Sequence, residues 1–268
     1  MKRKLCNVAL GVTIYFPNRD YLDNIVRYAE LFENIFIYLN SPIKRELINH
    51  EIFLNKKVVK MGNNENHGLS KSYNSFINRC FSERIKYLLI LDQDSILSEK
   101  YEHLGLFFLE ENIPPHDAAL ITLDKFPKKY LKKRGIKKFL NYGKNISFSK
   151  INFTINSGSI IIVDKFKIFG GYDEDFFVDK VDTDICKSIK LNRLFIYKIS
   201  HGFIYHDVGD TKIIKILNLK LNYHNPSRIY SIAHSRIIFN EKWILRSLHI
   251  KLPIKLILFF FISSLQIF

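Results

Sequence analysis

The sequence predicts a single α/β domain built around a parallel, doubly wound sheet. Strand-like apolar runs alternate with helical patterns through the first hundred residues, and this alternation gives a parallel sheet. Polar residues follow several of the runs at their carboxyl ends, where ligands bind in such sheets. The run at residues 87–91 is apolar throughout, as expected of a strand buried on both faces, and Asp92 and Asp94 follow it. We therefore expect one compact unit with a ligand site at the carboxyl edge of its sheet.

The first elements follow from hydrophobic spacing. Residues 8–15 and 34–39 are predicted strands, each closed by turn-forming residues. Between them, residues 21–32 carry apolar side chains at helical spacing, with Asn18 or Asp20 as the expected cap. The basic N-terminus resembles a signal peptide, but no small-residue cleavage site follows it, so we interpret it as leading into the first strand.

The next elements lead to the strand that precedes the two aspartates. A weaker helix is expected at 46–54 and a short strand at 57–61. A polar loop then leads into a helix at 69–84, with Ser70 as the expected cap. Because these elements continue the strand and helix alternation, they extend the predicted parallel sheet.

The second half reads differently, although no repeat or low-complexity linker separates it from the first. The lysine-rich stretch 125–145 is expected to be a mobile connection, and 170–174 a turn. Further strands are expected at 118–123, 160–163, 194–199 and 203–205, and a short helix at 181–190. One domain therefore covers residues 1–240, with halves at 1–100 and 101–240.

Composition restricts the class of protein. The chain of 268 residues is 47% hydrophobic, so a sizeable core is available. The formal charge of +15 implies an anionic partner, either nucleic acid, an anionic membrane surface or a phosphorylated substrate, while its lysine runs also fit a solvated face. No zinc-finger spacing, RNP-like sequence or basic zipper region is present, so nucleic acid is not expected. Three distant cysteines, Cys6, Cys80 and Cys186, argue against a disulfide framework or structural zinc and favour a reducing compartment.

The C-terminal residues 241–268 form a basic and then apolar tail. The apolar part, 252–268, is shorter than the ~20 apolar residues of a spanning helix. Basic residues just before it favour an interfacial membrane segment, and a terminal helix packed on the domain is the alternative.

Asp92 and Asp94 are the first candidate site. On a strand they would point the same way, because side chains repeat every second residue. Two carboxylates where a buried strand opens into a loop are costly unless a positive charge lies between them. Mg2+ binds through one or two carboxylates together with substrate phosphates, so a divalent ion carrying a diphosphate is the functional interpretation. A polar Asp-Ser turn without an ion is the structural alternative.

Further candidates lie in the acidic stretch 173–184 and after the last strand. Asp179, Asp182 and Asp184 fall where an apolar segment leads into a helix. There a carboxylate either stabilises the helix dipole or acts as a general base toward a substrate hydroxyl. His206, after an apolar strand, fits a metal ligand, a phosphate contact or a structural histidine.

Several motifs occur together in a fixed order. They are VTIYFPN (12–18), ENHGLSKSYN (65–74), LDQDS (91–95), NSGSIII (156–162), GGYDEDFFVDKVDTDIC (170–186), HDVGD (206–210) and HNPSRIYS (224–231). Together they resemble glycosyltransferase family 2 with its GT-A fold, which has a Rossmann-like nucleotide-binding sheet and an acceptor-side subregion. The resemblance is greatest to the bacterial rhamnosyltransferase-like branch, which writes its DxD motif as DQDS. It covers roughly residues 8–240.

The resemblance implies an inverting enzyme that depends on Mg2+ or Mn2+. Its donor would be dTDP-L-rhamnose or a similar nucleotide sugar, and its acceptor a lipid-linked oligosaccharide in O-antigen or capsule synthesis. It would then act in the cytoplasm, peripherally on the inner face of the plasma membrane. By analogy Asp182 is the catalytic base, with Asp179 as the fallback. Metal ligands would be Asp92, Asp94 and His206, and substrate contacts would come from Tyr15, Asn40, Asn66, Gly68, Asp92, Asp94, Ser157, Gly158, Asp179 and Arg228.

Some residues depart from the family pattern. Leu39 stands where the family usually has an Asp, Phe16 replaces an Asn, and His234-Ser235 replaces an Arg-Asn pair. These departures bear on donor identity more than on fold. They leave two alternatives open, a glycosyltransferase with another donor sugar and an inactive relative that only binds a sugar nucleotide.

Overall fold

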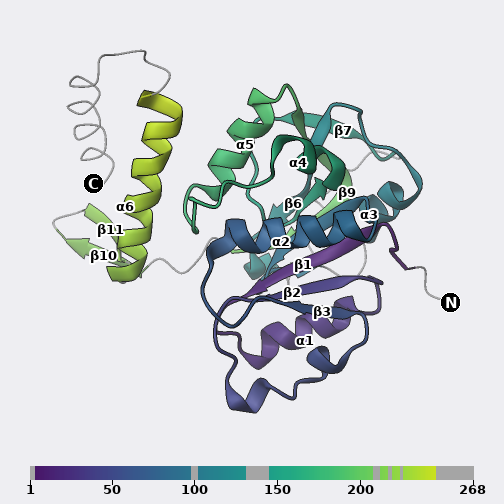
Figure 1. The fold of residues 1–268 in the computed structure, drawn as a ribbon, viewed down its shortest axis with the longest axis horizontal. Coiled ribbons are helices and arrows are strands. Elements are labelled where there is room, and N and C mark those ends of the chain that lie inside the picture. The colour runs from purple at the N-terminus through teal and green to yellow at the C-terminus, as the bar shows by residue number, and fades with distance from the viewer. Residues whose placement is uncertain are drawn as a thin grey trace.

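The computed structural model describes residues 4–97, 102–130, 145–207, 212–216, 219–223 and 226–245. Its main sheet has nine strands within these residues, in the order β3-β2-β1-β4-β8-β6-β9-β5, with β7 also paired to β9 (Figure 1). The strands are β1 (Val8–Ile14), β2 (Ile35–Leu39), β3 (Val58–Met61), β4 (Tyr87–Asp92), β5 (Ile96–Leu97), β6 (Ala118–Phe126), β7 (Phe148–Ile151), β8 (Ser159–Ile162) and β9 (Phe195–Tyr205). A separate hairpin joins β10 (Lys212–Ile216) and β11 (Leu219–Tyr223).

The helices cover both faces of the sheet. They are α1 (Arg19–Tyr28), α2 (Gly68–Ser82), α3 (Glu102–Glu111), α4 (Val163–Phe169), α5 (Val181–Leu191) and α6 (Pro226–Asn240), which runs on into a π-helical turn at Glu241–Leu245. Side chains of α1 and α3 pack on one face, and those of α2, α4 and α5 pack on the other. The result is a three-layer α/β arrangement, as the sequence predicted.

The parallel sheet expected from the strand and helix alternation of the first half is confirmed as far as β4, and beyond β4 the sheet is mixed. Strands β3, β2, β1 and β4 are parallel, but β8 runs antiparallel to both β4 and β6. The chain enters β8 through a turn at the carboxyl end of β4, where the Gly158 N–H donates to the Ile90 carbonyl at 2.8 Å. Because it enters from that end, β8 must run in the opposite direction to β4, and the second half is a mixed sheet.

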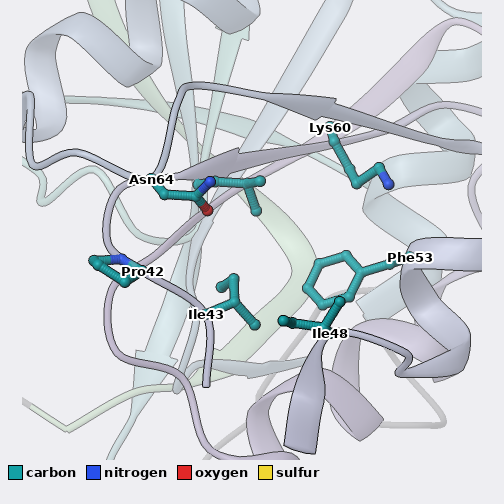
Figure 2. Close-up of a pocket in the computed structure, with 7 residues that line it drawn as sticks. Pro42, Ile43, Ile48, Phe53, Lys60 and Asn64 are labelled. Atoms are coloured by element: carbon teal, nitrogen blue, oxygen red, sulfur yellow. The ribbon is translucent and has the colours of Figure 1, made fainter. Parts of the chain in front are cut away.

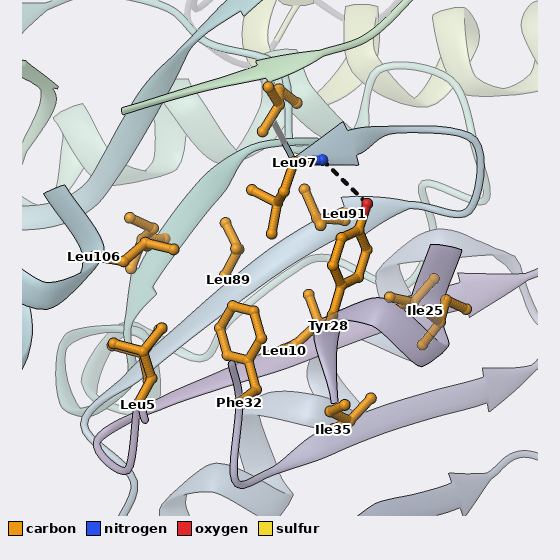
Figure 3. Packing of buried hydrophobic residues seen from close by; sticks show 14 of the residues in the cluster. Leu5, Leu10, Ile25, Tyr28, Phe32, Ile35, Leu89, Leu91, Leu97 and Leu106 are labelled. Carbon is orange, nitrogen blue, oxygen red and sulfur yellow. Dashed lines mark hydrogen bonds between the residues drawn. The ribbon is translucent and has the colours of Figure 1, made fainter. Parts of the chain in front are cut away.

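The core beneath the sheet reaches the turn after β4. In Figure 3, Tyr28 of α1 stands among buried leucines of β1, β4 and α3, and its hydroxyl accepts a hydrogen bond from the Leu97 N–H at 3.1 Å. The same hydroxyl donates to the Ser95 carbonyl at 3.3 Å. The segment that follows the two aspartates is therefore tied to a fully packed layer rather than left as a free loop.

Several local predictions are confirmed and others are wrong. Asn18 caps α1, since its side chain accepts from the Tyr21 N–H, whereas Asp20 lies within the first turn. Ser70 does not cap α2; it is buried, and its hydroxyl donates to the Phe176 carbonyl at 2.6 Å. The helix expected at 46–54 consists of two 3-10 turns, Arg45–Leu47 and Glu51–Leu54.

The second half shows the largest differences from expectation. The two strands expected at 194–199 and 203–205 are one strand, β9, whose pairing with β6 shifts register where His201 has a positive φ. The first part of the expected mobile stretch 125–145 is ordered, since β6 runs to Phe126 and a 3-10 turn follows at Lys128–Tyr130. The remainder, 131–144, lies outside the described residues, as does 246–268, most of the predicted membrane tail. Elements β5, β7, α3, α4, α6 and the β10–β11 hairpin were not predicted.

Candidate active site

The DQDS turn brings Asp92 and Asp94 together with His206. Oxygen and nitrogen ligand atoms of the three residues lie within 4.8 Å of one another. The strand period is not the cause, because β4 ends at Asp92 and a turn follows, in which the Ser95 N–H donates to the Asp92 carbonyl at 2.9 Å. His206 arrives from the end of β9, whose Tyr205 pairs with Ile96 of β5. Two chain segments far apart in sequence thus build one group.

This group is short of positive charge. Burial, followed by the negative charges of Asp94 and Asp182, raises the pKa of Asp92 to about 7. The Asp92 side chain still exposes 38% of its surface, so its carboxylate remains reachable from solvent. Burial lowers the pKa of His206, which favours the neutral imidazole that a metal ion requires. Two carboxylates and an imidazole therefore suit a divalent cation such as Mg2+ or Mn2+.

Among the described residues, Lys128 supplies the one cation within bonding distance of Asp94. Its ammonium lies 2.7 Å from Asp94 Oδ2, and the two side chains are 25% and 30% exposed. The sequence interpretation missed this lysine, which it placed among the basic residues of a mobile connection. One feature of its position could have indicated its role. Lys128 follows strand β6 by two residues, and the neighbouring strand β9 leads to His206.

Gln93 joins the ends of β1 and β4. Its side-chain amide donates to the Tyr15 carbonyl and accepts from the Tyr15 N–H, both at 2.9 Å. The next N–H, of Phe16, donates to Ser41 Oγ at 2.6 Å, which adds the end of β2. Tyr15 is left with 45% of its surface exposed beside the two aspartates' turn. This hydrogen bonding was not predicted, because it links residues that are distant in sequence.

Asn40, Asn66 and Gly68 lie together beyond the end of β2. The Asn40 amide donates to Asn66 Oδ1 at 3.0 Å and accepts from the His67 N–H at 2.8 Å. Gly68 has a φ of +81°, and a Cβ there would lie 2.5 Å from the Phe177 carbonyl oxygen, so only glycine fits. The network fixes the start of α2 next to the segment that leads to α5. The predicted contact of these three residues with a nucleotide remains a prediction.

Ser157 and Gly158 contact the end of β4 and the DQDS turn that follows it. Ser157 is buried, and its hydroxyl accepts from the Asp92 N–H at 3.0 Å and lies 2.7 Å from Ser95 Oγ. Ser95 Oγ in turn lies 2.9 Å from His206 Nδ1, so a chain of hydroxyl groups joins the two segments of the metal-type group. These contacts show that Ser157 supports the turn that carries the two aspartates. Its predicted contact with the donor sugar or the acceptor remains a prediction.

Asp182 lies in the first turn of α5. The Asn156 N–H donates to Asp182 Oδ1 at 2.7 Å, and Asn156 Oδ1 accepts from the Tyr172 hydroxyl at 2.7 Å. Burial raises the pKa of Asp182, while the Asn156 N–H and the charge of Lys125 oppose that rise. Since the charge of Asp182 also raises the pKa of Asp92, the two carboxylates lie close enough to interact.

The other acidic residues of 173–184 have different surroundings. Asp184 is buried, accepts from the Trp243 indole N–H at 2.6 Å and pairs with Lys242 at 2.9 Å, while Asp173 pairs with the same lysine at 2.6 Å. They hold the chain after α6 against the start of α5, so Asp184 is a structural residue rather than a candidate base.

Lys125 is a second lysine near the carboxylates of the candidate site. Burial lowers the pKa of the Lys125 ammonium to about 8.

Asp179 and Arg228 form an ion pair. Arg228 Nη2 lies 3.2 Å from Asp179 Oδ1, and this contact brings the start of α6 to the segment before α5. Asp179 Oδ2 is buried without a hydrogen-bond partner among the described residues. Such an atom is costly to leave unpaired. The predicted role of Asp179 as a substrate contact or fallback base remains a prediction.

A separate pocket lies near the end of β2, away from the two aspartates and His206. The pocket has a volume of about 380 Å³. Figure 2 shows Pro42, Ile43, Ile48 and Phe53 around it, with Lys60 and Asn64 at its edge. It contains none of the predicted site residues and no carboxylate. The chemistry of the metal-type group therefore lies elsewhere, at the ends of β4 and β9.

Comparison with known proteins agrees with this arrangement. The dTDP-rhamnosyl transferase RfbF of Shigella flexneri is 27% identical over 246 residues, which cover 88% of this chain and 80% of that protein. Solved structures with a similar fold include GalNAc-T7 with UDP, GalNAc and Mn2+, at a TM-score of 0.54 and 9% identity. Residues 1–349 of S. aureus TarS with UDP-GlcNAc give a TM-score of 0.52 at 13% identity. This chain is a glycosyltransferase of the GT-A fold.

The extent of these matches differs. This glycosyltransferase chain is covered to 87% by GalNAc-T7 and 92% by residues 1–349 of TarS, and it spans 49% and 76% of those chains. It spans 46% of the longer S. aureus TarS chain. No family model matches the sequence. Among the described residues, no helix has the length and apolarity needed to cross a bilayer.

Proposed function

We propose that this glycosyltransferase transfers a sugar, L-rhamnose in the first instance, from a nucleotide diphosphate with inversion and with the help of a divalent ion. The relative named dTDP-rhamnosyl transferase supports the donor class, and neighbours solved with UDP or UDP-GlcNAc support a nucleotide sugar in general. The observation that carries the proposal is the group of Asp92, Asp94 and His206 within interaction range of Asp182.

The donor would lie over the carboxyl ends of the parallel strands. Tyr15, Asn40, Asn66 and Gly68 follow β1, β2 and β3 along this edge and would contact the nucleoside, as the resemblance predicted. Asp92, Asp94 and His206 would hold Mg2+ or Mn2+. When bound, the ion would neutralise the charge that grows on the departing diphosphate.

Asp182 would act as the base toward the attacking acceptor hydroxyl. The Asn156 N–H fixes one carboxylate oxygen at 2.7 Å, which orients the other toward an incoming hydroxyl. The raised pKa of Asp182 makes it a stronger base than an exposed aspartate. Because a base outside the metal-binding group can take the proton on the face opposite the leaving group, a single displacement inverts the anomeric centre.

The acceptor would approach from the side of α5 and α6. Asp179 and Arg228 lie there, and the unpaired Asp179 Oδ2 suits a sugar hydroxyl. We propose a lipid-linked oligosaccharide of O-antigen or capsule synthesis as the acceptor, used by an enzyme lying peripherally on the cytoplasmic face of the plasma membrane. The basic and apolar sequence of 241–268 supports that location, at ~1 kcal/mol for each Lys or Arg near an anionic surface. Cosedimentation with anionic vesicles should decrease when residues 250–268 are removed.

A panel of nucleotide sugars, each with Mn2+, Mg2+ or EDTA, tests the donor assignment. A true donor at 100 times its Kd stabilises the protein by about 2.7 kcal/mol, so its Tm rise in a thermal-shift assay should require the metal. The rhamnose donor should give the largest rise and, with an acceptor glycan, a product with the inverted anomeric configuration by NMR. Stabilisation by another sugar nucleotide would change the donor, and binding without transfer or hydrolysis would favour an inactive relative.

A further inference from the structure

The ammonium of Lys128 lies against Asp94, one of the three residues that would bind the proposed ion. It pairs with Asp94 at 2.7 Å, and its positive charge lowers the pKa of both Asp92 and His206. One lysine therefore acts electrostatically on all three residues that could ligate a metal. No role for Lys128 follows from the resemblance or from the comparisons.

Backbone hydrogen bonds hold the main chain around Lys128, while its side chain is held through the ion pair with Asp94. The Lys128 N–H donates to Asp207 Oδ1 at 3.0 Å, and the His206 N–H donates to the Phe126 carbonyl at 2.9 Å. The ends of β6 and β9 thus hold each other in place. A lysine has a flexible four-carbon stem with a rotatable ammonium, so the charge can move although the backbone is held.

We propose that Lys128 competes with the divalent ion for Asp94 in the empty enzyme and binds the donor diphosphate once the ion is in place. The inference rests on the proposed metal and donor chemistry. A doubly charged ion on Asp94 repels the ammonium strongly at this range. The diphosphate arrives with the ion, and a lysine binds phosphate as a point charge.

Lys125, near the end of β6 and three residues before Lys128, provides a contrast. Its ammonium donates to Thr122 Oγ1 at 2.5 Å and Thr154 Oγ1 at 3.0 Å, and also to the Leu123 carbonyl at 3.3 Å. With three acceptors from the protein, Lys125 is held by neutral oxygens. The side chain of Lys128 instead pairs with the charged carboxylate of Asp94, which a metal ion would bind. The exchange of partners is therefore specific to Lys128.

The test compares Lys128→Met with Lys129→Met in the full chain. Lys129 carries the same charge one residue away, but it is exposed and its ammonium lies 5.3 Å from the Tyr130 ring centre. Mn2+ binding without nucleotide is measured by electron paramagnetic resonance, and dTDP and UDP binding in saturating Mn2+ by calorimetry. Lys128→Met should bind Mn2+ about tenfold more tightly and the nucleotide diphosphate about tenfold more weakly, the size expected for one charge-assisted contact. Lys129→Met should change neither affinity.

Opposite signs of the two effects distinguish competition from simple support of the site. If Lys128→Met weakens both Mn2+ and nucleotide binding, or alters neither while the wild type binds Mn2+, the inference is overturned and the proposed function stands. If the wild type binds no Mn2+ even with nucleotide, both are overturned. Lys128→Arg keeps the charge and should stay close to the wild type in both measurements, and thermal unfolding checks that each variant is folded.

Discussion

The carboxylates after β4 and the carboxylate at the start of α5 interact, but the protein holds them in different ways. Asp92 and Asp94 lie close together in the turn that begins at Asp92, and the Lys128 ammonium pairs with Asp94. Asp182 has one oxygen fixed by a backbone N–H, which is in turn part of a buried chain of hydrogen bonds. The first region stores electrostatic strain that a bound cation relieves, whereas the second is oriented before any ligand arrives.

Asp94→Ala should have the largest effect. It removes the carboxylate that can hold the ion and leaves Lys128 without its partner, so metal-dependent transfer should fall by about four orders of magnitude, equivalent to several kcal/mol of charge stabilisation. Transfer rates with Mn2+ and with EDTA measure it. Asp164→Ala, in the exposed first turn of α4, is the matched control and should retain wild-type rates. Wild-type transfer by Asp94→Ala would remove the difference between the two regions.

Asp182→Asn should leave donor binding intact and lower kcat by about 10³-fold, since the amide cannot accept the proton. The pKa of Asp182 is raised, and a base works only when deprotonated. The wild-type rate should therefore fall on the acidic side at a higher pH than an exposed aspartate would give, and the variant should lose that dependence. The control is Asp175→Asn, which makes the same change in an exposed turn. Unaltered turnover by Asp182→Asn would reject the assignment of the base.

Tyr172→Phe should have the smallest effect of the three. It removes the hydroxyl that donates to Asn156 Oδ1 at 2.7 Å and leaves that buried oxygen unpaired. We expect a loss of about 1 kcal/mol in the free energy of unfolding and a fall in kcat of about tenfold, with KM for the donor unchanged. Urea unfolding and steady-state kinetics measure these quantities. Tyr230→Phe, on an exposed ring, should change neither. A stability loss without any change in kcat would show that Asp182 keeps its orientation without Tyr172.

The sequence predicted the first region better than the second. The strand β4, its two aspartates and His206 were identified because a continuous apolar run and short motifs mark them locally. The second region depends on Asn156 and Tyr172, whose contacts with Asp182 join residues separated by a glycine-rich turn and a helix. No local pattern reports such contacts. Lys128 was missed for the same reason, since its partner Asp94 lies 34 residues earlier.

Missed elements have related causes. Helix α4 begins directly at the end of β8, so one apolar run contains both a strand and a helix and hides the boundary. Strand β7 is short and partly exposed, and only its pairing with β9 makes it a strand. The sequence predicted a break between two strands at the place where β9 shifts its register against β6. Polar residues mark that place in the sequence, but they do not distinguish a register shift inside one strand from a loop between two.

The hydrogen bonds of Gln93 restrict which residue type can lie between the two aspartates. Its side-chain amide donates one hydrogen bond to Tyr15 and accepts another from it. The side chain therefore takes the place of a backbone peptide group and extends the hydrogen bonding between β1 and β4 by one residue. A glutamate of the same shape would lose the donor and place a third anion in the turn. Gln93 thus joins the ends of two strands through its side chain, and it fastens the turn that carries Asp92 and Asp94 to the end of β1.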